Sequence, residues 1–204
     1  AVCSVPNPKD FEKILELRKK FEDCIFVCLG LHPEYIFDYT TRQIEEYMEF
    51  IKDKKKEIIG IGEVGLDYNC IKEKEKQEKT KEIFIQFIGL AKEMKLPLVI
   101  HTRNDIGHGD AISDALKILT DENAKDVMMH CFSGNEQNLK YALEQNYWIS
   151  FATIIARSDK HKRLASKTPV ENMLLETDAP WLDPDSRELV NRPWQIERSA
   201  EIIA

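Results

Sequence analysis

Short runs of apolar residues alternate along the chain with segments whose apolar residues recur three or four positions apart. The apolar runs are continuous, as in CIFVCLGL at residues 24–31, and do not alternate with polar residues. Continuous runs of this length predict strands that are buried on both faces, as in a parallel sheet. We expect seven strands, at residues 1–5, 24–31, 57–67, 96–103, 126–132, 147–153 and 171–178.

In the segments between these runs, apolar residues recur at the spacing of an α-helix. In residues 40–54, one helix face would carry Ile44, Tyr47, Met48 and Ile51. The polar stretch at residues 72–81 mixes both charge signs among good helix formers, which indicates a solvated helix start and not a nucleic-acid patch. Further helices are expected at residues 10–21, 83–94, 111–119, 136–145, 161–167 and 196–204.

Regular alternation of strands and helices allows either a doubly wound sheet or a (β/α)8 barrel. A barrel needs eight strands and typically about 250 residues. Seven strands in 204 residues therefore fit a TIM barrel from which one β/α unit is missing. No linker or composition break divides the chain, so we expect a single domain over residues 1–204.

Composition excludes several classes of protein. The apolar fraction of 43% is typical of a globular chain and not of a disordered one. No apolar run is long enough to cross a membrane, and no signal peptide is visible. The net charge of −7 argues against general affinity for nucleic acid but leaves room for a local metal site. The five cysteines form no CxxC pair, which favours free thiols in a reducing, cytoplasmic compartment.

Potential ligands follow the apolar runs at one topological position. In a parallel barrel, the carboxyl ends of all strands meet on one face, where active sites are built. Imidazoles and carboxylates gathered there suit a hydrolytic site for divalent metal ions. The residues that end these runs are His32, Glu63, His101, His130 and Asp178.

Five blocks in chain order resemble the TatD family of metal-dependent deoxyribonucleases, which are amidohydrolase-like barrel enzymes. The resemblance covers nearly the whole chain, so it is far more specific than one block alone. The blocks are GLHPEY (residues 30–35), IGEVGLDY (61–68), LPLVIHTRN (96–104), HCFSG (130–134) and LLETDAPWL (174–182), with NRP (191–193) after them.

The resemblance implies roles at the matching positions. Glu63 would bridge two divalent metal ions, which could be magnesium, manganese or zinc. His101 and His130 would bind one ion, while Asp178 would bind the other and act as the base for the attacking water. His32 would lie near the substrate phosphate.

Several further residues are expected in the substrate cleft. The resemblance also implies Arg103 and Arg192 as cleft residues. Trp181 would either stack on an unpaired base or pack under its own loop. Ser133 lies where a helix is expected to open, so nearby backbone N–H groups would either meet a phosphate or be capped in the ordinary way.

The sequence departs from the family pattern in one respect. The family opens with a strand that carries an HxH pair, and no HxH occurs here. We therefore expect the chain to begin at the family's second strand, which would cost one metal two ligands. His108 lies in a loop and does not match the pair, so we interpret it as a surface residue.

Three functions follow from this sequence. The first is a metal-dependent deoxyribonuclease, expected to trim single-stranded or frayed DNA ends. The second is a metal hydrolase of an ester or amide bond, such as the aminoacyl ester of a mischarged tRNA, because the same ligands activate water for either bond. The third is a metal-poor, non-catalytic barrel. Retention of carboxylates that repel one another without a cation argues against the third.

Overall fold

The computed structural model describes residues 1–204, which form two compact units, Ala1–Val127 and Met128–Ala204. Each of the seven expected apolar runs contains a strand, and helical segments separate the strands. The single domain expected over residues 1–204 stays a prediction. No helix reaches the length and apolar character that crossing a bilayer would require.

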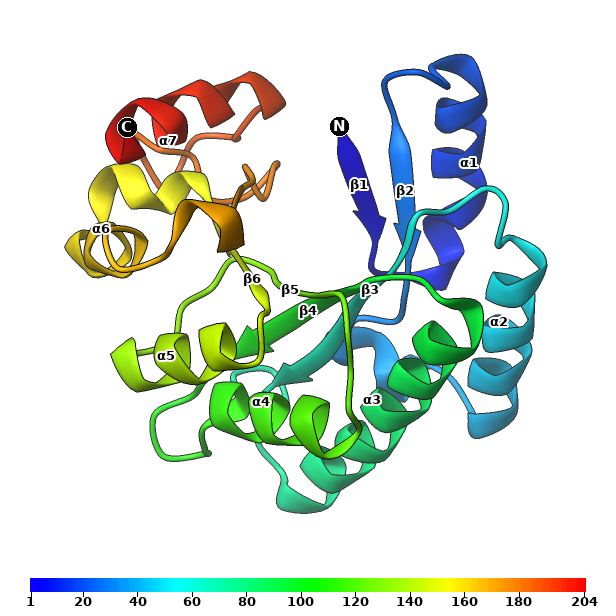
Figure 1. The fold of residues 1–204 in the computed structure, drawn as a ribbon. Helices are drawn as coiled ribbons and strands as arrows, with labels where there is room; N and C mark the ends of the chain where they lie inside the picture. The colour runs from blue at the N-terminus through cyan, green and yellow to red at the C-terminus, as the bar shows by residue number, and fades with distance from the viewer. The chain divides into compact units, whose positions relative to one another are not determined.

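The first unit is built on parallel strands that pair in chain order (Figure 1). Residue partners in neighbouring strands include Ser4 with Cys28, Cys28 with Gly60, and Gly65 with His101. The strands are β1 (Val2–Val5), β2 (Phe26–Leu29), β3 (Gly60–Asp67) and β4 (Leu98–Arg103). Because these strands are parallel, their carboxyl ends lie at one edge of the sheet.

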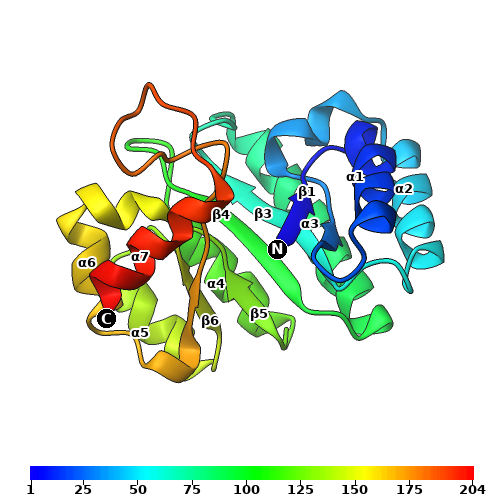
Figure 2. The ribbon, with the colours of Figure 1, turned by 90° about the horizontal axis from the view of Figure 1, so that it is seen from above.

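Helices cover the strands of this unit, and α3 and α4 pack against β3 (Figure 2). Helix α3 begins at Lys74, so most of the polar stretch at residues 72–81 is the start of this helix, as predicted. Helix α2 begins after a capping box in which Thr40 and Gln43 satisfy each other's backbone N–H groups. The helices are α1 (Phe11–Lys20), α2 (Thr41–Asp53), α3 (Lys74–Met94) and α4 (Ala111–Asp121).

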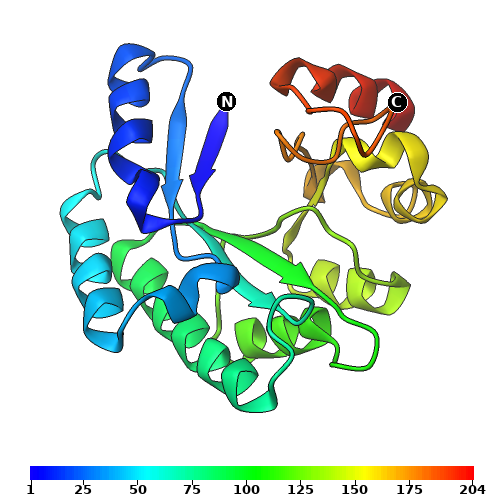
Figure 3. The same ribbon diagram turned by 180° about the vertical axis from the view of Figure 1, so that it is seen from behind.

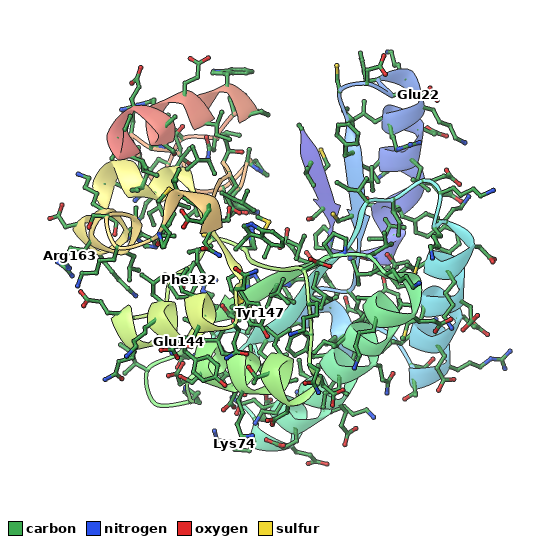
Figure 4. All side chains as sticks on the ribbon, viewed as in Figure 1. Glu22, Lys74, Phe132, Glu144, Tyr147 and Arg163 are labelled. Carbon is green, nitrogen blue, oxygen red and sulfur yellow. The ribbon has the colours of Figure 1, made fainter.

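The second unit repeats the pattern with shorter strands, which are also parallel. Phe132 and Tyr147 are buried in its core, and Figure 4 labels both. The strands are β5 (Val127–Met129, entering from the first unit), β6 (Trp148–Phe151) and β7 (Met173–Leu175). The helices are α5 (Glu136–Glu144), α6 (Asp159–Ala165) and α7 (Ile196–Ile203), seen from behind in Figure 3.

Candidate metal centre

The first unit gathers its predicted site residues near the carboxyl ends of β2, β3 and β4. His32 follows β2, Glu63 lies within β3, and His101 lies within β4. One potential ligand atom from each of these side chains lies within 4.8 Å of the others. The imidazole rings of His32 and His101 meet edge to face, with centroids 4.1 Å apart. The structure thus brings together Glu63 and His101, both predicted ligands, and adds His32 to them.

Two glycines allow the strands that carry these residues to approach closely. A Cβ on Gly30 would lie 2.6 Å from the carbonyl carbon of Gly62 and 2.8 Å from the backbone oxygen of Glu63. Gly65 has a φ of +145°, and a Cβ there would lie 2.0 Å from the backbone oxygen of His101. Only glycine fits these two positions, so the GLHP and GEVGLD blocks position the cluster as well as supply it.

The ring of His101 is held by a buried carboxylate. Its Nε2 lies 3.2 Å from Oδ2 of Asp67, a side chain that is 2% exposed. Burial raises the pKa of Asp67, but hydrogen bonds from His101 and from the backbone of Cys70 outweigh burial and lower it to about 2. Asp67 is therefore ionised and accepts the Nε2 proton, which leaves Nδ1 of His101 with a lone pair for a metal ion.

In His32, Nδ1 accepts a hydrogen bond and Nε2 carries the proton. The backbone N–H of Glu34 donates to its Nδ1 at 3.2 Å, because His32 is the N-cap of the 3-10 helix Pro33–Asp38. A neutral imidazole that accepts at Nδ1 carries its proton on Nε2. A protonated Nε2 donates a hydrogen bond and does not bind a metal. This tautomer supports the substrate-phosphate role expected of His32 over that of a third ligand.

The second unit contains a matching pair of imidazole and carboxylate. Nδ1 of His130 lies 2.9 Å from Oε1 of Glu176 and 3.0 Å from Oε2. The hydroxyl of Ser150 also donates to Oε2 of Glu176, at 2.6 Å. Glu176 therefore accepts a hydrogen bond from Nδ1–H of His130, which leaves the lone pair of Nε2 for a metal. That nitrogen lies 3.6 Å from Oδ1 of Asp178, so His130 and Asp178, both predicted ligands, come together.

A buried amide holds the loop that carries Asp178. The side-chain amide of Asn191, which is 1% exposed, donates to Oγ1 of Thr153 and to the backbone oxygen of Thr177, both at 2.7 Å. The backbone N–H of Asn191 donates to the oxygen of Pro180. These bonds fix the chain on both sides of Asp178, whose φ of +57° lies in the left-handed region that aspartate tolerates better than most residues.

The remaining predicted residues lie mainly on the surfaces of the two units. Arg103 ends β4 and is exposed, as is Arg192. Trp181 is 70% exposed, so it does not pack under its loop. Ser133 is half-buried, and its backbone oxygen accepts a bond from Lys160 at 2.5 Å. Asn135 caps α5 through a capping box with Asn138. Side chains of the protein therefore already accept hydrogen bonds from backbone N–H groups at the start of this helix.

Sequence reasoning assigned no role to Asp67, Glu176 or Asn191. All three lie inside or beside the quoted blocks, and Asp67 lies four residues after Glu63 in the same strand. Their position in those blocks was the available signal. Their partners are distant in sequence, so the roles became visible only in the folded chain.

Comparison with known proteins gives the family. The sequence profile described as TatD related DNase matches residues 1–204. The chain is 30% identical to human deoxyribonuclease TATDN3, covering 100% of this chain and 74% of that protein. It is 34% identical to an uncharacterized metal-dependent hydrolase of Methanocaldococcus jannaschii, covering 94% of this chain and 71% of that protein.

Solved structures give the fold. The crystal structure of YJJV, a TatD homologue from Escherichia coli, superposes with a TM-score of 0.86 at 23% identity, over 99% of this chain and 76% of that one. A TatD-family hydrolase from Entamoeba histolytica gives a TM-score of 0.83 at 19% identity, with the same coverage. These neighbours confirm the TIM-barrel fold class. Since the family profile spans the whole chain, this hydrolase belongs to the family of TatD-related DNases.

Proposed function

We propose that the chain hydrolyses phosphodiester bonds of DNA with divalent metal ions, as an exonuclease acting on single strands or ends. The observation that carries this proposal is the pair of carboxylate-backed histidines, His101 with Asp67 and His130 with Glu176. Histidine ligands of catalytic metals are commonly held by such carboxylates. The names of the relatives, a deoxyribonuclease and a metal-dependent hydrolase, support the same reaction class.

The donor set fits divalent ions. In the first unit, Glu63 and His101 would hold a divalent ion, and in the second unit His130 and Asp178 would hold one. Nitrogen and carboxylate donors of this kind admit zinc, manganese or, with more carboxylate, magnesium. When bound, such ions supply a water of lowered pKa and positive charge for the phosphate.

The chain's own residues would carry out the remaining steps. Asp178 would orient the attacking water and accept its proton. His32 would donate its Nε2 proton in a hydrogen bond to a phosphate oxygen, which its tautomer favours. Arg103 and Arg192 would contact other phosphates of the DNA, and Ser133 would lie beside the bound DNA. Trp181 is exposed enough to stack on an unpaired base, a contact that duplex DNA does not offer.

The test uses the full-length protein and a 5′-labelled single-stranded DNA. We expect cleavage with magnesium or manganese, none with EDTA, and loss of cleavage in Glu63→Gln and Asp178→Asn. Asparagine suits position 178 because it also tolerates the left-handed backbone. A closed circular duplex cut as fast as the single strand would contradict the preference for strands and ends.

The same preparation separates the alternatives. Release of an amino acid from charged tRNA, without release of nucleotides from DNA, would favour the ester or amide hydrolase. A folded full-length protein that binds no metal would favour the non-catalytic barrel.

The cytoplasmic location expected from the cysteine pattern stays a prediction.

A further inference from the structure

The loop between β4 and α4 contains an aspartate–histidine pair that the proposed function does not use. Nδ1 of His108 lies 2.5 Å from Oδ1 of Asp105. The other oxygen of Asp105 accepts from the amide of Asn69 at 3.0 Å and lies 3.7 Å from the ammonium of Lys72. Asp105 is thus bonded through both oxygens, and it fixes the orientation of the His108 ring.

Side chains from the start of α3 anchor the loop around His108. The backbone oxygen of His108 accepts from Nζ of Lys74 at 3.0 Å and from the buried amide of Gln77 at 3.2 Å. Both donors lie at the start of α3, where Figure 4 labels Lys74. Gly109 has a φ of +131°, and a Cβ there would lie 3.1 Å from the ring of Tyr68. Contacts other than the imidazole therefore help to hold the backbone of this loop.

Hydrogen bonds connect this pair to the candidate metal ligand His101. Oδ1 of Asp67 accepts the backbone N–H of Asn69 at 2.8 Å, and Oδ2 of Asp67 contacts His101. The side chain of the same Asn69 then reaches Asp105. The turn after β3 and the loop after β4 are therefore joined at the sheet edge where the candidate ligands lie. His108 belongs to that edge and not to a remote surface.

The chemistry of the pair is that of a proton donor. Asp105 accepts the Nδ1 proton, and Nε2 of His108 makes no hydrogen bond within the unit. The side chain of His108 is 39% exposed, which leaves Nε2 open to a ligand. The bond from His108 lowers the pKa of Asp105, so the carboxylate is ionised and accepts a hydrogen bond from the imidazole. A carboxylate at Nδ1 orients catalytic imidazoles in this way.

We propose that His108 is the general acid that protonates the leaving oxygen during phosphodiester hydrolysis, an inference that rests on the proposed function. The attacking water forms the new P–O bond and gives its proton to the base. The bond from phosphorus to the leaving oxygen breaks, and that oxygen takes the proton from Nε2 of His108. Neutral His108 then regains a proton from solvent, so the products are an alcohol and a phosphate monoester.

The test compares two substrates that differ in their need for a proton. A DNA phosphodiester expels a basic alkoxide, whereas bis(4-nitrophenyl) phosphate expels a phenolate that is stable without protonation. Removing a general acid costs about 10²–10⁴-fold in rate. We therefore expect His108→Gln of the full-length, metal-loaded protein to lose about that factor on single-stranded DNA. On the nitrophenyl ester, its rate should stay within a few-fold of the wild-type rate.

Controls keep the outcomes distinct. Glu63→Gln should lose both activities, because it affects the metal site itself. Ile106→Ala alters a fully exposed side chain of the same loop and should lose neither. Asp105→Asn should reproduce the selective loss in weaker form. Metal content and thermal melting of each variant show that it is folded and loaded.

Two results would overturn the inference alone while wild-type protein cleaves DNA. One is an unchanged rate of His108→Gln on DNA. The other is an equal loss on both substrates, which would make His108 a structural or metal-site residue. If wild-type protein cleaves no DNA at all, the proposed function fails first, and the inference fails with it.

Discussion

His130 and Glu176 form a hydrogen-bonded pair across 46 residues of sequence, with 3.0 Å between Nδ1 and Oε2. The carboxylate fixes the imidazole tautomer and makes the opposite nitrogen a better ligand. The pair repeats the relationship of His101 to Asp67 with the ring reversed, since there Nε2 faces the carboxylate. Two histidines, one within β4 and one directly after β5, thus present one unprotonated nitrogen each.

Replacing Glu176 tests this relationship. Glu176→Gln keeps the size of the side chain and an acceptor oxygen, but it removes the charge that makes the ring basic. We expect the affinity for manganese to fall about 10–100-fold, measured by isothermal titration of the full-length protein. Glu188→Gln changes an exposed carboxylate of the same unit and should bind manganese normally. Equal affinity in both variants would contradict the role of Glu176.

His32 and His101 should differ in what their loss removes, although both lie in one cluster. His101→Gln removes a proposed ligand, so the bound metal should decrease. His32→Gln removes a hydrogen-bond donor, so metal content should be retained while kcat/KM on DNA falls. A hydrogen bond to a charged group contributes about 1.5–3 kcal/mol, which corresponds to about 10–150-fold. The metal content of each purified variant distinguishes the two roles. Loss of metal from His32→Gln would identify His32 as a ligand.

Gly30 and Gly89 offer a matched pair of glycine-to-alanine changes. A Cβ at Gly30 would overlap the backbone of Gly62 and Glu63, whereas a Cβ at Gly89 in α3 meets nothing within 4 Å. Gly30→Ala should cost about 1–3 kcal/mol of unfolding free energy, because nearby backbone must move. Gly89→Ala should gain about 0.5–1 kcal/mol as an exposed helix position.

Thermal melting measures both changes. For a chain of this size, each kcal/mol shifts Tm by roughly 2–4 °C. Gly30→Ala should therefore melt earlier than wild type and Gly89→Ala slightly later. A Gly30→Ala variant with unchanged Tm and activity would show that close approach at Gly30 is not needed to position Glu63.

The sequence predicted the order of strands and helices well, because each strand is a continuous apolar run and each helix has a regular apolar face. Residues at strand ends were also predictable, since parallel strands present their carboxyl ends at one edge. That reasoning chose Glu63 and His101, which the structure brings together in the first unit, and His130 and Asp178, which it brings together in the second.

Contacts between distant side chains could not be predicted in the same way. Asp67 reaches His101 across 34 residues, and Asn191 reaches Thr153 across 38. No periodicity marks such pairs, because they depend on strand register and loop path. His108 illustrates the same limit: its sequence suggested a surface residue, and its bond to Asp105 became evident only with the fold.

Asn191 should stabilise the loop of Asp178 through Thr153, and a double-mutant cycle measures that coupling. Asn191→Ala removes the buried amide that donates to Thr153 Oγ1 and to the oxygen of Thr177, at a cost of about 1–3 kcal/mol. Thr153→Val breaks the same network from the other side. Because the two residues share one bond, the double variant should lose less than the sum of the single losses, as measured by urea unfolding. Losses that add within about 0.5 kcal/mol would show that the two side chains act independently. In the same variants kcat on DNA should fall together with stability, since the bonds that hold Thr177 also position Asp178.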